Sequence, residues 1–246
     1  MKKPGPEIRY PRRRLIRGVL RGVINLLFAL LTDLEIVGQE NLPQGGPLLV
    51  AVNHFCFVDP ALVVRVTPWP LEVMGGYHTP NAPFNETSLL NLWGYFPVHR
   101  GTGSRSALRS AEAVLAQGGV VGIAPEGGAW ATVLRPPRPG AAFLAARTGA
   151  LILPMGIDGA IDVFPSLRRG CRAHVTVRIG KTFGTFQASG RGQERRQQLD
   201  EIGHEIMRHI AELIPPERRG YYSDDPAIRA AARGTEIYPW DQGSEI

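Results

Sequence analysis

Short runs of mostly apolar residues recur along this chain, several of them unbroken, and they constrain its fold more than any other feature. They lie at residues 34–37, 48–52, 71–74, 96–99, 120–124, 151–157 and 174–179. Strands covered on both faces have this continuous pattern, whereas half-exposed strands alternate apolar with polar residues. Helical patterns separate the runs, at residues 60–66, 104–117, 140–148 and 193–213. The alternation predicts an α/β fold with a mixed, largely parallel sheet of about seven strands flanked by helices.

An amphipathic pattern precedes the first of these runs. If residues 11–31 are helical, one sector of the helix carries Arg13, Arg14, Arg17 and Arg21. The other side carries Leu15, Ile16, Val19, Val23, Leu26 and Leu30. The uncharged stretch is too short to cross a bilayer, which takes about 20 apolar residues. We expect a basic helix in a membrane interface, with its arginines toward an anionic surface. The alternative is a helix packed on its own domain with a solvated arginine face.

The length of 246 residues suits one α/β domain with terminal additions. We place the amphipathic helix at residues 1–33, the domain at 34–216 and a C-terminal tail at 217–246. The net charge of +6 favours anionic partners, for which a phospholipid surface and a phosphate-bearing substrate are the candidates. No motif for nucleic acid or nucleotides supports those ligands. The two cysteines suggest neither a disulfide framework nor a zinc site, which favours a reducing compartment.

The most informative local pattern follows the apolar run at 48–52. His54 and Asp59 are separated by four residues, and Pro60 comes next. Asp59 and Pro60 predict the start of a helix, with Asp59 as its N-cap and Pro60 at the first helical position. The resulting strand-to-helix turn would place an imidazole at the carboxyl end of a strand, where open α/β sheets have their sites. A nearby carboxylate would keep one imidazole nitrogen protonated and leave the other as a base.

Four segments, in order, resemble the signature blocks of the glycerolipid acyltransferases, the family that includes 1-acylglycerol-3-phosphate acyltransferases. The first is the pair of His54 and Asp59, and the second is GYFPVHRG at 94–101. The third is VGIAPEGG at 121–128, and the fourth is LILPMG at 151–156. A His and an Asp at this spacing are weak evidence alone, but four blocks in order are strong evidence. The resemblance covers residues 34–180 approximately.

The resemblance implies acyl transfer from a thioester, either acyl-CoA or acyl carrier protein, to a hydroxyl of a lysophospholipid such as 1-acylglycerol-3-phosphate. It implies neither a metal nor a cofactor, because a thioester is already an activated acyl group. Together with the amphipathic helix and the reducing compartment, the expected lipid substrate predicts attachment to the cytoplasmic face of the cell membrane, as a peripheral or monotopic protein. The implied catalytic residues are His54, as the base, and Asp59, which orients it. The implied substrate-binding residues are Arg100, Gly101, Glu126, Gly127 and Pro154.

Within this set, Arg100 would bind a phosphate through the N–H donors of its planar guanidinium. Glu126 would accept a hydrogen bond from the acceptor hydroxyl or hold Arg100 in place. The N–H groups of Gly127 and Gly128 would face a bound anion, unless the two glycines simply form a turn. Pro154 would shape the end of a strand.

The chain departs from the family pattern at two places. Cys56 stands where the first block usually has Ser, and Gly128 and Ala129 replace a hydroxyl residue and an Arg of the third. These departures leave open another acceptor, such as an ornithine lipid, a glycolipid or an alcohol. A non-catalytic lipid-binding module is the second alternative. A Cys–His nucleophile at Cys56 is the third.

Overall fold

The apolar runs form one sheet in the computed structural model, which describes residues 8–76, 91–98 and 105–235. In this part of the chain the sheet has seven strands in the order β1-β7-β6-β2-β5-β3-β4. Their bounds are β1 Thr32–Val37, β2 Leu48–Val52, β3 Leu71–Gly76, β4 Phe96–Val98, β5 Val120–Ile123, β6 Leu151–Asp158 and β7 Ala173–Ile179. Neighbouring strands are parallel except for β6 and β7, which are antiparallel. The predicted mixed, largely parallel sheet is therefore confirmed.

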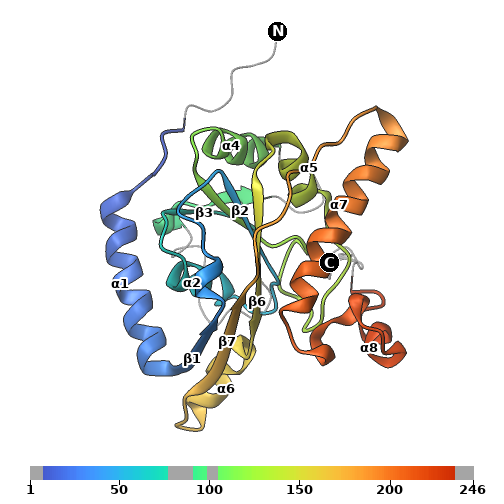
Figure 1. The fold of residues 1–246 in the computed structure, drawn as a ribbon. Helices are drawn as coiled ribbons and strands as arrows, with labels where there is room; N and C mark the ends of the chain where they lie inside the picture. The colour runs from blue at the N-terminus through green and yellow to red at the C-terminus, as the bar shows by residue number, and fades with distance from the viewer. Residues whose placement is uncertain (1–7, 77–90, 99–104, 236–246) are drawn as a thin grey trace, which may run out of the picture.

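Helices cover both faces of this sheet, as the unbroken apolar runs predicted (Figure 1). The longer helices are α1 Arg14–Leu31, α2 Asp59–Val66, α4 Arg105–Leu115, α5 Pro139–Thr148 and α7 Gly192–Glu212. The shorter ones are α6 Val163–Arg168 and α8 Pro226–Ala231. Successive residues of β2 point to opposite faces, and every one of them is buried.

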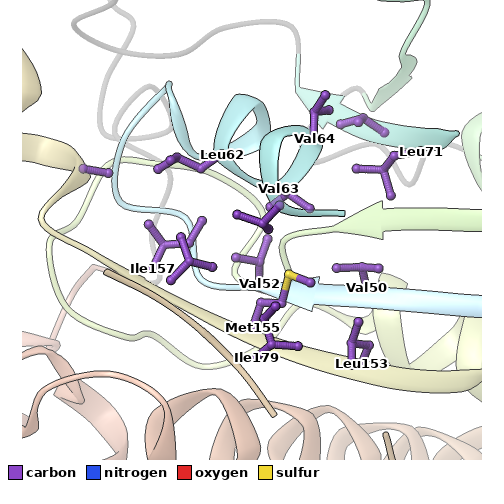
Figure 2. Packing of buried hydrophobic residues seen from close by; sticks show 14 of the residues in the cluster. Val50, Val52, Leu62, Val63, Val64, Leu71, Leu153, Met155, Ile157 and Ile179 are labelled. Atoms are coloured by element: carbon purple, nitrogen blue, oxygen red, sulfur yellow. The ribbon is translucent and has the colours of Figure 1, made fainter. Parts of the chain in front are cut away.

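The two faces of β2 supply two separate hydrophobic clusters. Val50 and Val52 pack with α2 and with Leu153 and Met155 of β6, as Figure 2 shows. Leu49 and Ala51 face the other way, toward α4, α5 and α7. Because both clusters meet at β2, this strand is the centre of the core, and the turn that follows it is held firmly.

The N-terminal helix is present, but its arginine face does not lie as the sequence suggested. The Arg17 guanidinium is 5% exposed and pairs with the fully buried carboxylate of Glu72 in β3. Arg12 donates to the same carboxylate, Arg13 donates to the backbone carbonyl of Leu92, and Arg21 donates to that of Trp69. Arg14, by contrast, is exposed. The helix therefore packs on its own domain, as the alternative expected, but Arg12, Arg17 and Arg21 contact the domain and do not form a solvated face. The expectation of a membrane interface stays a prediction.

The apolar side of α1 faces outward instead. Its exposed large side chains are Leu15, Ile16, Val19, Val23, Leu26, Leu27 and Leu30. Leu15, the most exposed of them, has 87% of its surface accessible. Among the described residues, no helix combines the length and the apolar character that crossing a bilayer requires.

The described part of the tail folds back on the domain. Its backbone pairs with a loop that follows β5, where Leu134 donates to the carbonyl of Arg218 at 2.9 Å. Tyr221 donates to the carbonyl of Leu134 at 2.9 Å. These contacts anchor the loop, residues 127–138, that lies beside the candidate site.

Candidate active site

The site is built at the carboxyl ends of two adjacent parallel strands, β2 and β5. The residue directly after β2, Asn53, is buried and continues the pairing with β6 through its side chain. Its amide donates to the carbonyl of Ile157 at 2.8 Å and accepts from the N–H of Ile157 at 2.7 Å. An unpaired buried amide would be costly, so these bonds fix the point at which the chain leaves the sheet.

His54 and Asp59 meet across this turn. The Nδ1 atom of His54 lies 3.0 Å from Oδ2 of Asp59, whose side chain is almost completely buried. A carboxylate can only accept, so Nδ1 carries the proton and Nε2 is the nitrogen left for proton transfer. The His54 side chain is 14% exposed, which leaves the ring partly accessible. The chain has thus placed a base with a defined tautomer at the edge of the sheet.

Asp59 also holds the backbone of the turn. Its Oδ2 atom accepts from the N–H groups of Phe55 and Cys56, each at 2.8 Å. The expectation that Asp59 is a side-chain N-cap is wrong: it is the first residue of α2, and Val58 occupies the cap position without a side-chain bond. The carboxylate turns back to the preceding residues because the bend exposes their N–H groups to it. One carboxylate thereby fixes both the ring and the main chain.

A second carboxylate binds the same turn from β5. Glu126 follows this strand, and its Oε1 atom accepts from the His54 N–H at 3.0 Å. Its Oε2 atom accepts from both the backbone N–H and the Nε–H of Arg135, each at 3.2 Å. Burial raises the pKa of Glu126, and the positive charge of Arg135 opposes that rise. Three successive N–H groups, at residues 54–56, therefore donate to carboxylates.

Glu126 is 1% exposed, and its carboxylate accepts from His54 and Arg135 beneath the turn. The expectation that it binds the acceptor hydroxyl or holds Arg100 stays a prediction, since Arg100 lies outside the described residues. Arg135 was not predicted. No motif marks it, although a carboxylate three residues after a buried strand was a signal that a cation must lie nearby.

The remaining predicted residues are placed as follows. Gly127 has a φ of 85° and donates to Ala124 at 3.1 Å, so its N–H closes a turn. Pro154 is buried within β6 and pairs with Ala51 of β2, rather than lying at a strand end. Arg100 and Gly101 lie outside the described residues. The structure therefore brings together His54, Asp59 and Glu126.

Cys56 is next to the base, but its chemistry does not suit a nucleophile. Burial, followed by the negative charge of Asp59, raises the pKa of the Cys56 thiol to about 11. The thiolate is the reactive form of cysteine, and it is scarce at neutral pH under these conditions. The structure thus argues against the Cys–His alternative. In the described ranges, no group of three or more His, Cys, Asp or Glu side chains is arranged to hold a metal ion.

Comparisons with known proteins agree with this geometry. A family model described as Acyltransferase matches residues 33–158. Among solved structures, the fold is similar to the 1-acyl-sn-glycerophosphate (LPA) acyltransferase PlsC from Thermotoga maritima, with a TM-score of 0.53 and 19% identity. That match covers 77% of this chain and 79% of the other. The family match spans just over half of the chain and includes His54, Asp59 and Glu126, so the chain belongs to the acyltransferase family and is an acyltransferase.

Proposed function

We propose that this acyltransferase moves a fatty acyl group from a thioester, acyl-CoA or acyl carrier protein, to a hydroxyl of a lysophospholipid such as 1-acylglycerol-3-phosphate in phospholipid biosynthesis. The observation that supports the mechanism is the contact between His54 and Asp59 at the end of β2. It supplies a general base with a free Nε2 and a carboxylate that stabilises the imidazolium. The PlsC enzyme of similar fold acts on an acceptor of this class, which motivates the choice.

The transfer follows from these two residues. Nε2 of His54 removes the acceptor hydroxyl proton while the oxygen attacks the thioester carbonyl carbon. The tetrahedral intermediate collapses as the C–S bond breaks, and the imidazolium returns the proton to the leaving thiolate. Asp59 stays ionised and balances the transient positive charge of the ring. Arg100, with Gly101, is proposed to bind the acceptor phosphate, and the planar donor fork of arginine suits that role.

The acceptor is tested by offering the full-length protein a labelled acyl thioester with a panel of hydroxyl acceptors. The panel holds 1-acylglycerol-3-phosphate, other lysophospholipids, an ornithine lipid, a glycolipid and a simple alcohol. Of these acceptors, we expect 1-acylglycerol-3-phosphate to give the highest kcat/KM. The His54→Ala protein should be inactive with every acceptor. Equal or better use of an uncharged acceptor would contradict the proposal that the acceptor carries a phosphate. The absence of the family's hydroxyl residue and Arg, where this chain has Gly128 and Ala129, would then account for the different acceptor.

We further propose that the enzyme is attached through the outward face of α1 to the cytoplasmic face of the cell membrane, where the thioester donors are found. The face presents Leu15, Val19, Val23, Leu26 and Leu30, all about half exposed or more. A stripe of this kind is rarely left in water, and a lipid acceptor would be delivered at the bilayer surface. Because Arg17 and Arg21 are bound within the protein, the attachment would depend on apolar burial more than on charge.

A further inference from the structure

The pair formed by Arg135 and Glu126 lies directly beneath the base of the site. Both side chains are at most 1% exposed, and Arg135 Nε lies 3.2 Å from Glu126 Oε2. The other oxygen of Glu126 accepts from the main-chain N–H of His54 at 3.0 Å. A single carboxylate therefore joins a buried guanidinium to the backbone that carries the imidazole.

This carboxylate depends on its cation. Burial raises the pKa of Glu126, and the charge of Arg135 is the largest influence that opposes the rise, ahead of the bonds from the two backbone N–H groups. Among the described residues, the titratable side chains of His54 and Tyr222 also interact electrostatically with Glu126. Because a buried, unpaired carboxylate is unfavourable, loss of Arg135 would leave Glu126 either protonated or displaced.

Arg135 is itself held in a fixed position. Its guanidinium lies 3.8 Å from the ring centroid of Trp130, and it also donates to the carbonyl of Gly128. The preceding residue, Leu134, is bound through both its N–H and its carbonyl to the segment that contains Arg218 and Tyr221. A guanidinium held on several sides can transmit a precise position to Glu126.

We propose that Arg135 is a positioning residue for acyl transfer, acting through Glu126 on the main chain of His54. It does not contact substrate. It holds Glu126 in place, and Glu126 holds the turn so that the imidazole points at the acceptor hydroxyl. This role rests on the proposed function of His54 as the base.

A double-mutant cycle tests this role, with Arg135→Met, Glu126→Gln and the double variant assayed for kcat and both KM values. We expect Arg135→Met to lower kcat on the order of 10²-fold, as small misplacements of catalytic groups do, with little change in either KM. In the double variant the neutral amide oxygen still accepts from His54, and no buried charge lacks a partner. The double variant should therefore be more active than Arg135→Met alone. Independent effects that simply multiply would overturn the role of Arg135.

The chain offers a matched control, since Arg17 and Glu72 form a second buried pair outside this site. Arg17→Met should lower thermal stability without lowering kcat in detergent micelles, at a temperature where the protein remains folded. If Arg135→Met does not fold, Arg135→Lys is the second variant, since it keeps the positive charge but lacks the planar guanidinium with its fixed N–H donors. It should lower kcat and leave both KM values unchanged. A normal kcat in Arg135→Lys would overturn the proposal in that case.

The outcome for His54→Ala separates the two hypotheses. Activity in His54→Ala would contradict the proposed function itself. An inactive His54→Ala protein, together with multiplicative effects of the Arg135 and Glu126 substitutions, would contradict only the positioning role.

Discussion

Arg17 and Glu72 form a buried, two-pronged ion pair that joins α1 to the sheet. Nη1 of Arg17 lies 2.7 Å from Oε1 of Glu72, and Nη2 lies 2.8 Å from Oε2. Arg17 also donates to the carbonyl of Trp93 at 2.9 Å, and its guanidinium lies over the Trp93 ring. The contact decides which side of α1 faces the domain and hence which side faces outward.

Arg17→Met should therefore loosen α1. Removing one partner of a buried pair typically costs about 3–5 kcal/mol in the free energy of unfolding. Because Arg12 still pairs with Glu72, we expect a loss near the lower end of that range. Urea unfolding measures the loss, and amide exchange along α1 shows where it occurs. A variant as stable as the parent, with unchanged exchange in α1, would rule out the anchoring role of Arg17.

The same pair should make the protein sensitive to acid. Burial by itself raises the pKa of Glu72, but hydrogen bonds from Arg17 and Arg12 outweigh it and hold the pKa below its ordinary value of 4.5. A carboxyl with a lowered pKa contributes stability that is fully present above its unfolded pKa and lost as pH falls through its folded pKa. The stability difference between the parent and Glu72→Gln should be constant from pH 7 to about 5 and shrink below 4.5. A constant difference down to pH 3, measured by urea unfolding, would contradict the assignment.

Membrane binding should depend on the apolar face of α1 and only weakly on salt. If each of Leu15, Val19 and Leu26 contributes about 1.5 kcal/mol on burial, replacing all three by Ser should weaken liposome binding on the order of 10³-fold. Sedimentation with anionic liposomes at low and high salt measures both effects. Val37→Ser, at an exposed apolar residue on β1, is the control and should bind normally. If high salt abolished binding of the parent protein to the liposomes, electrostatic attraction and not apolar burial would be the main contribution to membrane binding.

The sequence predicted the sheet well because the physical signal was strong. A strand covered on both faces must be apolar throughout, and β2 and β5 are buried at every residue. The pair of His54 and Asp59 was equally clear, since a strand that leads into a helix limits where the two side chains can lie. Local patterns of this kind need no knowledge of distant residues.

The orientation of α1 could not be read from its own pattern. Helical periodicity separates two faces but does not say which one meets the domain. The deciding information lay in β3, where Glu72 interrupts a buried apolar run and therefore needed a cation. The partner of Glu126 was hidden for the same reason, because Arg135 reaches it through a loop with no regular spacing.

Asp59→Asn should leave the fold largely intact while impairing catalysis. All three contacts of Asp59 reach Oδ2, so an amide oxygen in its place can still accept from Phe55, Cys56 and Nδ1 of His54. The neutral amide, however, no longer balances the positive charge that the imidazole gains during proton transfer. We expect kcat to fall about 10²- to 10⁴-fold, the range over which general-base catalysis contributes, with small changes in KM. Steady-state kinetics on the folded variant measures this, and near-normal kcat would contradict the role given to Asp59.

Cys56→Ser should retain activity, because the neutral thiol of Cys56 has no covalent role in the proposed transfer. With its pKa raised to about 11, the thiol should react slowly with iodoacetamide at pH 7.5, and the rate should climb steeply as pH approaches that value. Cys171 is exposed and provides the internal comparison, so peptide mapping should find it alkylated first. The Cys56→Ser protein should keep a kcat within a few fold of the parent, since the hydroxyl preserves the side-chain shape at slightly smaller volume. Rapid alkylation of Cys56 at neutral pH, accompanied by loss of activity that is also seen in Cys56→Ser, would reinstate a thiol nucleophile and remove His54 from its role as base toward the acceptor.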